Sequence, residues 1–504
     1  MARPDASQWK LAEVAEIEAF VKAKLFVEVK KPDSRRLVDC KWVYTIKRGP
    51  NREILKYKAC LVARGFTQIE GIDYNETFAP VSKFTSICSL LALTAHHDLE
   101  IHQMDVKSAF LNGDLNKEIY MQCPPGFEAK DSKVWKLNKS LYGLKQASRK
   151  WYKRVCAKFK AMGFTRSDYD HAIFFKLEDG HLLIAAVYVN DMLLVSDHTP
   201  VIQKLKSDLS TRFEMTDLGE AHWILNMEIV RDRPRNTLTL TQRQYTETIL
   251  NCFSLALSTP MVPNKKLEKL SKPEDGIDVK LYQSMLGSLM YAMTGTRPDL
   301  AYTVGVLSQH SATPGNAHIN AMKRVYRYLR GTLDYRIVYS SERHSDLIGY
   351  VDADWAADVS SRQSITGYVF LLAGGAISWS SKKQSSTALS TTEAEYMAAS
   401  DASKEAIWLR GLLHEFGCLN PSYSVLLMID NQSAIALVKN AEFHSRTKHI
   451  AIRYHFIRKI HDRGDILVEY CPTGDQVADI MTKALAREKH ERFVDGMGLS
   501  YHVR

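Results

Sequence analysis

The spacing of hydrophobic and polar positions changes along the chain and divides it into parts. Strand-like and helix-like segments alternate from Lys41 to about Ile229. Residues 264–276 are polar, charged and broken by a proline and a glycine, which predicts a loop between domains. A helical stretch then leads to a compact segment from about 346 to 483, where the pattern predicts three strands, a helix, a strand, a helix, a strand and a helix. This order is typical of a mixed α/β domain.

These changes set five predicted parts. They are an N-terminal lead-in helix in residues 1–40, a first domain in 41–263, a linker and helical connection in 264–345, an α/β domain in 346–489 and a C-terminal tail in 490–504. The lead-in begins as an amphipathic helix and continues as an irregular stretch. A chain of 504 residues is too long for one hydrophobic core, which agrees with more than one domain.

Composition and charge narrow the class of protein. No apolar run approaches the roughly 20 residues that span a bilayer, and the first residues lack a basic-then-apolar signal pattern. We therefore expect a protein without membrane segments that is either intracellular or not targeted by its own N-terminus. The eight cysteines include no CxxC pair, which argues against a disulfide framework and a structural zinc site. The net charge of +10 suits a polyanionic partner, nucleic acid before membrane.

Two carboxylates of the first domain stand where metal ions could be held. Alternation over residues 101–106 predicts a strand with Asp105 near its end. Asn190 and Asp191 are flanked on both sides by apolar runs, the pattern of a β-hairpin with a polar turn. A carboxylate at a strand end facing a carboxylate on a neighbouring hairpin can hold two Mg²⁺ ions for phosphoryl transfer. The alternative is that both acids only mark a strand end and a turn.

Four acids in the last domain fall on predicted strand ends and helix beginnings. They are Asp352 and Asp430 at strand ends, Glu395 just after a predicted capping box, and Asp479 in the first turns of the helix DQVADIMTKAL. Asp354 lies on the same strand face as Asp352. Such acids can meet at one sheet edge as a carboxylate cage that suits Mg²⁺ and not zinc, for attack of water on a phosphodiester. The helix dipole could explain Glu395 or Asp479 alone, but not the whole order.

A basic, histidine-rich stretch occupies residues 443–461. It predicts a cationic helix against a nucleic-acid backbone, and a solvated surface helix is the alternative. A zinc site is disfavoured because none of its histidines has a cysteine partner.

Several long stretches resemble the reverse transcriptase of copia-type retrotransposons. They include YKACLVARGFTQIEGIDYNETFAPVSKFTSI, QMDVKSAFLNGDL, YMQCPPGF, LNKSLYGLKQASRKWY and YVNDMLLV. The resemblance runs through the whole chain and implies an α+β right-hand polymerase with fingers, palm and thumb. It implies an RNA template, a DNA primer and dNTPs as partners of the polymerase.

The resemblance also implies roles for single residues of the first domain. Asp105 and Asp191 would be metal ligands. The expected substrate contacts are Lys58 and Arg64 toward the triphosphate, Phe110 crowding a ribose 2′-hydroxyl, and Tyr142 and Gly143 lining the nucleotide pocket. For the two cations, solvated charges on a strand remain an equal alternative.

This chain departs from the family at the hairpin, which has Tyr-Val-Asp-Asp in the family and Tyr-Val-Asn-Asp here. Asn190 offers an oxygen but no charge to two dications, so we expect metal affinity and polymerase rate to fall by orders of magnitude. Cys60 and Cys88 stand where the family usually has Arg, and Asn226 where it has Gly. Single-base changes could produce the Arg-to-Cys and Asp-to-Asn differences, as in a copy that drifts without selection.

The last domain is similar to the RNase H domain of the same polyproteins. The similarity lies in GYVDADWAADVSSRQSITGYVFLLAGGAISWSSKKQSSTALSTTEAEYMA, IDNQSAIALVKN and CPTGDQVADIMTK. It implies an α/β RNase H-like fold, an RNA–DNA hybrid as substrate, and a catalytic tetrad of Asp352, Glu395, Asp430 and Asp479. It implies two Mg²⁺ ions in each active site, with Mn²⁺ as the alternative ion.

In the family, capsid, protease and integrase precede this region, so we expect the chain to be the C-terminal part of a polyprotein, with the ending GMGLSYHVR close to the family's own end. Its partners would then include other parts of that polyprotein, in cytoplasmic virus-like particles with the nucleus as a second location. We expect an impaired RNA-directed DNA polymerase with an intact RNase H tetrad. The alternatives are a non-catalytic nucleic-acid-binding remnant or scaffold, and a hybrid nuclease alone.

Overall fold

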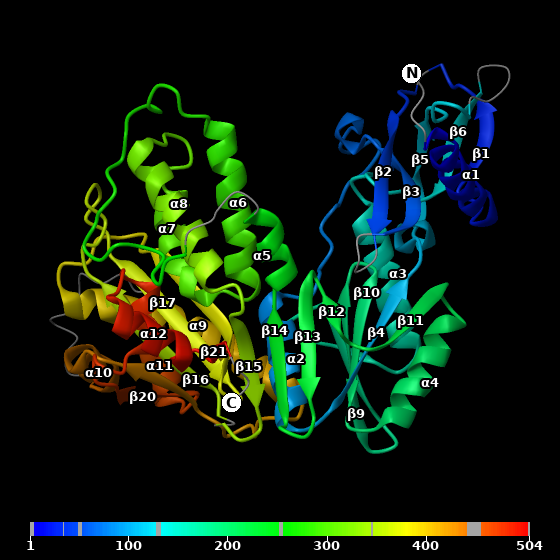
Figure 1. Ribbon diagram of the computed structural model, residues 1–504. Helices are drawn as coiled ribbons and strands as arrows, with labels where there is room; N and C mark the ends of the chain where they lie inside the picture. The colour runs from blue at the N-terminus through cyan, green and yellow to red at the C-terminus, as the bar shows by residue number, and fades with distance from the viewer. Residues whose placement is uncertain are drawn as a thin grey trace.

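A computed structural model describes residues 5–501 except 34, 49–52, 128–132, 251–255, 344–345 and 441–454. The N-terminal residues form a small lobe, drawn in blue at the upper right of Figure 1. Its elements are α1 (Ala6–Lys22), β1 (Phe26–Lys30), the hairpin β2 (Cys40–Arg48) and β3 (Ile54–Ala63), β5 (Asp114–Met121) and β6 (Lys133–Lys139). The stretch after α1 was expected to be irregular but contains β1, which pairs with β6. The lead-in is therefore part of the lobe.

A six-stranded sheet in the order β11-β4-β10-β9-β8-β7 lies below this lobe. Its strands are β4 (Glu100–Val106), β7 (Thr165–Arg166), β8 (Ile173–Glu178), β9 (His181–Tyr188), β10 (Asp191–Ser196) and β11 (Met215–Glu220). The predicted strand at 101–106 and the predicted hairpin are both confirmed. One face packs against α3 (Ala147–Ala161) and α4 (Thr199–Ser210), and the other against α2 (Phe84–His96).

A second sheet joins segments from distant parts of the chain. Its order is β12-β13-β14-β15-β21, with β12 (Trp223–Ile224), β13 (Met227–Asp232), β14 (Thr237–Thr241), β15 (Arg336–Ser340) and β21 (Leu499–Ser500). Leu225 and Asn226 form the turn between β12 and β13, with φ values of +51° and +55°. Asparagine tolerates this left-handed backbone better than most residues, which fits a position where the family has Gly. The boundary predicted at 489–490 falls inside α12 (Arg487–Gly496).

The connecting region is helical, as predicted, and lies at the upper left of Figure 1. It contains α5 (Arg243–Ile249), α6 (Val279–Gly295), the short 3₁₀ helix η4 (Pro298–Leu300), α7 (Ala301–Ser308) and α8 (Asn316–Gly331). Residues 264–276 form no helix or strand, so the predicted loop is confirmed. The buried Arg297 and Asp299 pair at 2.7 Å, and Tyr328 of α8 donates a hydrogen bond to Asp299. This network fixes η4 against α8.

The C-terminal domain has a five-stranded sheet in the order β18-β17-β16-β19-β20. Its elements are β16 (Ile348–Asp354), β17 (Ile365–Leu372), β18 (Gly375–Lys383), α9 (Thr391–Glu415), β19 (Val425–Ile429), α10 (Gln432–Lys439), α11 (Phe456–Asp462), β20 (Ile466–Tyr470) and the 3₁₀ helix η7 (Val477–Met481). The predicted order is confirmed up to β20. Most of the basic stretch 443–461 lies outside the described residues, and its last part forms α11.

The helix predicted around Asp479 is wrong, because the chain forms only the five-residue η7 there. The side chain of Gln476 accepts a hydrogen bond from the Ala478 amide and so caps this turn. The turn also packs directly on β17, where a Cβ on Gly367 would lie 2.6 Å from the Cβ of Met481. Tight packing and local capping together replace the expected α-helix with a single tight turn.

The six-stranded sheet that contains β4, β9 and β10, called the palm sheet below, shares one hydrophobic core with the C-terminal domain. Helix α2 and the connecting helices lie in this core, between the two sheets. Polar contacts reinforce this interface. The Trp408 indole of α9 donates a hydrogen bond to the Tyr169 carbonyl at 2.7 Å, and the Lys83 ammonium lies 3.9 Å from the centre of the Trp408 ring. Among the described helices, none combines the length and apolar character that a bilayer crossing requires.

Candidate active sites

The first candidate site lies at the end of the palm hairpin. Asp105 of β4 and Asp191, the first residue of β10, are direct partners in the antiparallel pair. Val189 adopts a left-handed φ of +56° at the turn. Its carbonyl accepts a hydrogen bond from the Trp151 indole at 2.5 Å, and the Asn190 carbonyl accepts one from the Val106 amide at 2.8 Å. These bonds hold the turn so that its polar side chains face the end of β4.

Each carboxylate of this site already has a hydrogen-bond donor. The Asn190 amide nitrogen donates to Asp105 Oδ1, and the Gln103 amide nitrogen donates to Asp191 Oδ1 at 3.2 Å. Burial raises the pKa of Asp191, the Gln103 hydrogen bond opposes this, and the charge of Asp105 adds to it. Each carboxylate therefore accepts a hydrogen bond from a neutral amide, and position 190 adds a donor to the site instead of a third negative charge.

The expected nucleotide-pocket residues lie beside this cluster. The rings of Phe110 and Tyr142 meet edge to face, with centroids 4.7 Å apart. Burial raises the pKa of Tyr142 to about 12, and Asp105 is among the charges that add to the shift. Gly143 has a φ of +88°, and a Cβ there would lie 2.1 Å from the Ala63 carbonyl oxygen. Only glycine fits this close approach to the end of β3.

Lys58 and Arg64 belong to the small N-terminal lobe, and both are exposed. The residues on either side of Arg64 pack on Tyr142 and Gly143, since the Ala63 amide donates to the Tyr142 carbonyl at 2.8 Å and a Cβ on Gly65 would lie 2.1 Å from the Gly143 carbonyl oxygen. Lys58 is in β3, opposite Thr45 of β2. Arg64 forms an ion pair with Asp39 at 3.0 Å. Their expected contact with a triphosphate remains a prediction.

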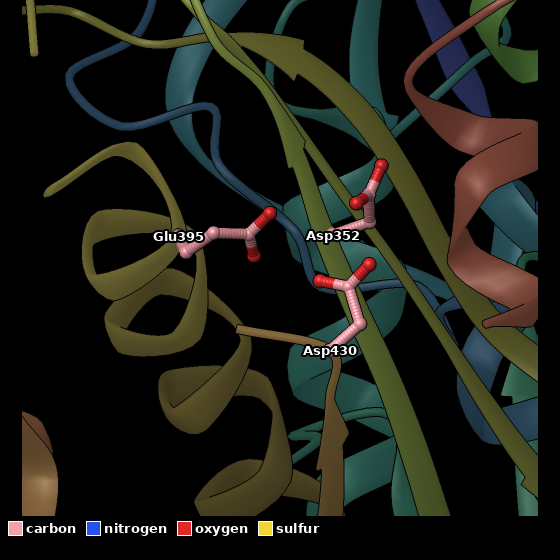
Figure 2. A group of neighbouring side chains, drawn as sticks. All are labelled: Asp352, Glu395 and Asp430. Carbon is pink, nitrogen blue, oxygen red and sulfur yellow. The ribbon is translucent and has the colours of Figure 1, made fainter. Parts of the chain in front are cut away.

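The second candidate site lies where β16 and β19 run parallel in the C-terminal domain. Val351 and Ile429 are partners in that pair, so the next residues, Asp352 and Asp430, come together at one sheet edge. Glu395 reaches the same point from the first turns of α9. The carboxylates of Asp352, Glu395 and Asp430 point toward one another in Figure 2, with ligand oxygens all within 4.8 Å.

Hydrogen bonds orient these three carboxylates without satisfying them. The Ala353 amide donates to Glu395 Oε1 at 3.1 Å, and the Thr473 hydroxyl donates to Asp430 Oδ2 at 2.8 Å. The Thr482 hydroxyl donates to Asp352. The second oxygen of Glu395, Oε2, is buried and has no hydrogen-bond partner in the described part of the chain. Buried carboxylate oxygens are seldom left unpaired, and this one together with its neighbours could serve as a ligand for a metal ion.

Burial and mutual repulsion dominate the electrostatics of this site. Burial raises the pKa of Asp352 to about 7, and the charges of Asp479 and Asp430 add to this while Lys483 opposes it. Burial raises the pKa of Glu395 well above its ordinary value, with the charges of Asp352 and Asp430 adding to the effect. A divalent cation would relieve this repulsion, and the all-oxygen donor set suits Mg²⁺ or Mn²⁺.

Asp479 does not join the three-carboxylate cluster but lies next to it. Its side chain is fully buried and is paired with Lys483, at 2.8 Å, and with Lys489. The Lys483 ammonium also lies 3.7 Å from Asp352 Oδ2, so it links the two acids. Sequence analysis missed both lysines, although the four-residue spacing from Asp479 to Lys483 is that of an ion pair on a helical segment. It also missed Gln103, which alternation places on the same strand face as Asp105.

The fold and its two acidic sites define a class of protein, a right-hand polymerase palm packed against an RNase H-like domain. Residues 23–265 match the family model described as "Reverse transcriptase (RNA-dependent DNA polymerase)". The chain is 44% identical over 99% of its length to the "Retrovirus-related Pol polyprotein from transposon TNT 1-94" of Nicotiana tabacum, and 38% identical over 98% to that from transposon RE2 of Arabidopsis thaliana. It spans 38% and 34% of these relatives.

A transposon Ty5-1 protein of Saccharomyces cerevisiae is 34% identical over 60% of this chain and 100% of its own length. A foamy viral protease-reverse transcriptase, solved in complex with an RNA/DNA hybrid, matches 92% of this chain and 54% of its own. Its TM-score is 0.51 at 13% identity, which shows a common fold. This chain belongs to the reverse transcriptase family of retrotransposon Pol polyproteins.

Proposed function

We propose that the chain is a reverse transcriptase and RNase H module in which the nuclease site is competent and the polymerase site is impaired. The observation that carries this proposal is the contrast in hydrogen bonding. Glu395 Oε2 is buried beside two further carboxylates and has no partner among the described residues, whereas Asp105 and Asp191 face the neutral amides of Asn190 and Gln103. The substrate of the competent site would be the RNA strand of an RNA–DNA hybrid.

In the nuclease, Asp352, Glu395 and Asp430 would hold Mg²⁺ or Mn²⁺, with Asp479 beside them as the fourth member of the tetrad. Bound divalent ions supply a nucleophilic water and neutralise charge at the phosphodiester. The protein's own part is orientation. Thr482 fixes Asp352, the Ala353 amide fixes Glu395 and Thr473 fixes Asp430, so the three carboxylates are preorganised toward one point.

In the polymerase, Asn190 replaces a metal-binding aspartate of the family. Its amide nitrogen faces Asp105, so an ion at Asp105 would have to displace that hydrogen bond and would find a neutral group at position 190. Phe110 and Tyr142 would line the sugar site, with Gly143 beneath them, and Lys58 and Arg64 would meet the triphosphate. The polymerase partners would be an RNA template, a DNA primer and dNTPs.

The wider setting is part of the same proposal. The module would be made with other parts of a Pol polyprotein and would act in a cytoplasmic virus-like particle or in the nucleus, because its relatives are longer Pol polyproteins. The divisions 1–40, 41–263, 264–345, 346–489 and 490–504 remain our proposed domain boundaries. A second candidate is a non-catalytic nucleic-acid-binding scaffold. It is favoured by Lys483 and Lys489, which neutralise Asp479 from within the chain.

Cleavage of a labelled RNA–DNA hybrid in Mg²⁺ tests the proposal. The wild-type chain should cut the RNA strand, and Asp430→Asn should cut it at least about 100-fold more slowly. Asp401→Asn is the matched control, because Asp401 is only partly exposed on α9, pairs with Lys404 and lies outside the cluster. Binding of the hybrid without cleavage by the wild-type chain would support the scaffold instead, and undiminished cleavage by Asp430→Asn would refute the assigned site.

A further inference from the structure

A cavity of 520 Å³ opens where the inter-domain loop meets the C-terminal domain. Three separate parts of the chain form its wall. The loop contributes Lys265, Lys266 and Lys269, α7 and the residues just after it contribute Tyr302 and His310, and the C-terminal domain contributes residues 357–361 and Lys383. The cavity is thus shared between the connection and the nuclease domain, and none of the three clustered carboxylates lines it.

The charge of this cavity is positive. Lys265, Lys266 and Lys269 are exposed, and in the described part of the chain none of them pairs with a carboxylate. The Lys266 ammonium reaches across to the Ala357 carbonyl at 3.1 Å. The carboxylate in the lining, Asp358, is already engaged by the Ser361 amide at 2.6 Å and by Lys383 at 3.3 Å. Three lysines without a carboxylate partner among the described residues therefore line the same cavity.

A buried histidine forms part of the cavity wall. His310 is 5% exposed, and its ring stacks on that of His318 with centroids 4.0 Å apart. Burial lowers the pKa of His310 to about 4, so the ring adds no positive charge near pH 7. The positive charge that a ligand would meet in the cavity therefore comes from the lysines.

The cavity borders the nuclease cluster. Asp354 lies two residues beyond Asp352 on β16. The Lys266 ammonium donates a hydrogen bond to the Ala357 carbonyl, which lies three residues after β16 ends and five residues after Asp352. Lys266 therefore contacts the segment that continues directly from the end of β16. A nucleic acid held at the carboxylates would pass within reach of the lysines.

We infer that this cavity binds a backbone phosphate of the RNA–DNA hybrid, away from the phosphate that the carboxylates attack. The inference rests on the proposed nuclease function and extends it, because it gives the inter-domain loop a part in substrate binding. Phosphodiester oxygens match the three lysine ammonium groups and the serine hydroxyls of the lining. The same chemistry is present in both strands of the hybrid.

The test compares two triple variants in the full chain, each built on Asp430→Asn so that the hybrid stays intact. Lys265→Gln/Lys266→Gln/Lys269→Gln removes the cavity lysines. Lys272→Gln/Lys280→Gln/Lys323→Gln removes the same charge from exposed lysines outside the cavity. The cavity variant should raise the Kd for the hybrid about tenfold or more. It should also make the fall of log K with log salt less steep, with the magnitude of the slope reduced by about two. The control should stay within about twofold. Equal effects of the two triples would overturn the inference.

Chemically neutral linkages then identify the strand. Methylphosphonates in the contacted strand should abolish the difference between the two triples, and those in the other strand should preserve it. A difference that persists with both modified strands would overturn the inference. The nuclease function itself is tested separately. If that proposal fails, the wild-type chain will not cleave the hybrid in Mg²⁺. Cleavage by the wild-type chain, with a KM that stays unchanged when the three cavity lysines are replaced in that cleaving background, would refute the cavity alone.

Discussion

The two acidic sites of this chain both place carboxylates at strand ends, but the groups that surround those carboxylates differ. In the palm, Asp105 and Asp191 meet at strand ends, and an amide nitrogen donates to each of them. In the C-terminal domain, Asp352, Glu395 and Asp430 meet within 4.8 Å, and one buried oxygen has no partner among the described residues. The first cluster faces two neutral amide donors, whereas the second gathers three carboxylates around a buried oxygen, an arrangement that suits a divalent cation.

This difference shows that the number of acids does not alone decide whether a site needs metal. What decides it is whether nearby donors can replace the ion. Asn190 exchanges a negative charge for a donor, and that donor turns onto the carboxylate that remains. In the C-terminal domain, the Thr482 and Thr473 hydroxyls and the Ala353 amide each donate to one oxygen of a clustered carboxylate. The second oxygen of Glu395 has no partner among the described residues. The following predictions, from the largest effect to the smallest, can break or sharpen this comparison.

The largest effect is expected from Glu395→Gln. The variant keeps the shape of the side chain but replaces the carboxylate that carries the unpaired oxygen with a neutral amide, which is a weaker metal ligand. Hybrid cleavage should therefore fall by about 1,000-fold while hybrid binding is retained. A gel assay with labelled RNA measures the rate. Glu488→Gln, an exposed position on α12, is the control and should cleave normally. Near-normal cleavage by Glu395→Gln would remove this residue from the site.

The second effect is a gain of polymerase activity in Asn190→Asp. Restoring the carboxylate turns a hydrogen-bond donor into a metal ligand, so primer extension on an RNA template should rise by about 100-fold. Asn190→Ala removes the donor without adding charge and should give no such gain. If both variants extend primers equally well, the charge at position 190 is not what limits the site.

The third effect is stabilisation by divalent ions. An ion bound only by the folded chain at 100 times its Kd should raise the free energy of unfolding by about 2.7 kcal/mol. Asp352→Asn should lose this stabilisation, whereas Asp191→Asn should keep it, because the nuclease and not the palm carries the strong site. Thermal unfolding with and without Mn²⁺ measures it. Loss of the stabilisation in Asp191→Asn instead would reverse the comparison.

The smallest effect concerns pH in the absence of divalent ions. The pKa of Asp352 is raised to about 7 from its ordinary value of 3.8, so the folded chain holds this proton more tightly than the unfolded chain. Its contribution to stability is therefore present below about pH 4 and is lost as pH rises toward about 7. Relative to Asp352→Asn, the wild-type chain should lose up to about 1.4 kcal/mol of unfolding free energy per pH unit across that window. Urea unfolding in EDTA measures this, and a rising difference would contradict the assigned burial.

Much of the local structure around the sites was predictable from the sequence. The strand carrying Asp105 and the hairpin carrying Asp191 follow from alternation, which depends only on near neighbours. The start of α9 follows from its cap, since the Ser390 hydroxyl accepts a hydrogen bond from the Glu393 amide at 3.2 Å. Both features are local, and both place acids correctly on their elements.

What the sequence did not predict depends on distant contacts. The pairing of Arg336 with Ser500 joins β15 to β21 across most of the C-terminal half, and no local pattern indicates it. The 3₁₀ turn at Asp479 depends on packing against Gly367 of β17. The donors at Asp105 and the unpaired oxygen of Glu395 depend on side-chain directions that spacing does not specify. The acids were found from the sequence, but their electrostatic state was not.

One preparation of the wild-type chain, assayed for both activities in Mg²⁺, tests the central claim most directly. A labelled RNA template annealed to a DNA primer reports primer extension through the DNA strand and nuclease action through the RNA strand. We predict cleavage of the RNA with little or no extension of the primer in the same tube. Robust primer extension by the unaltered chain would contradict the account.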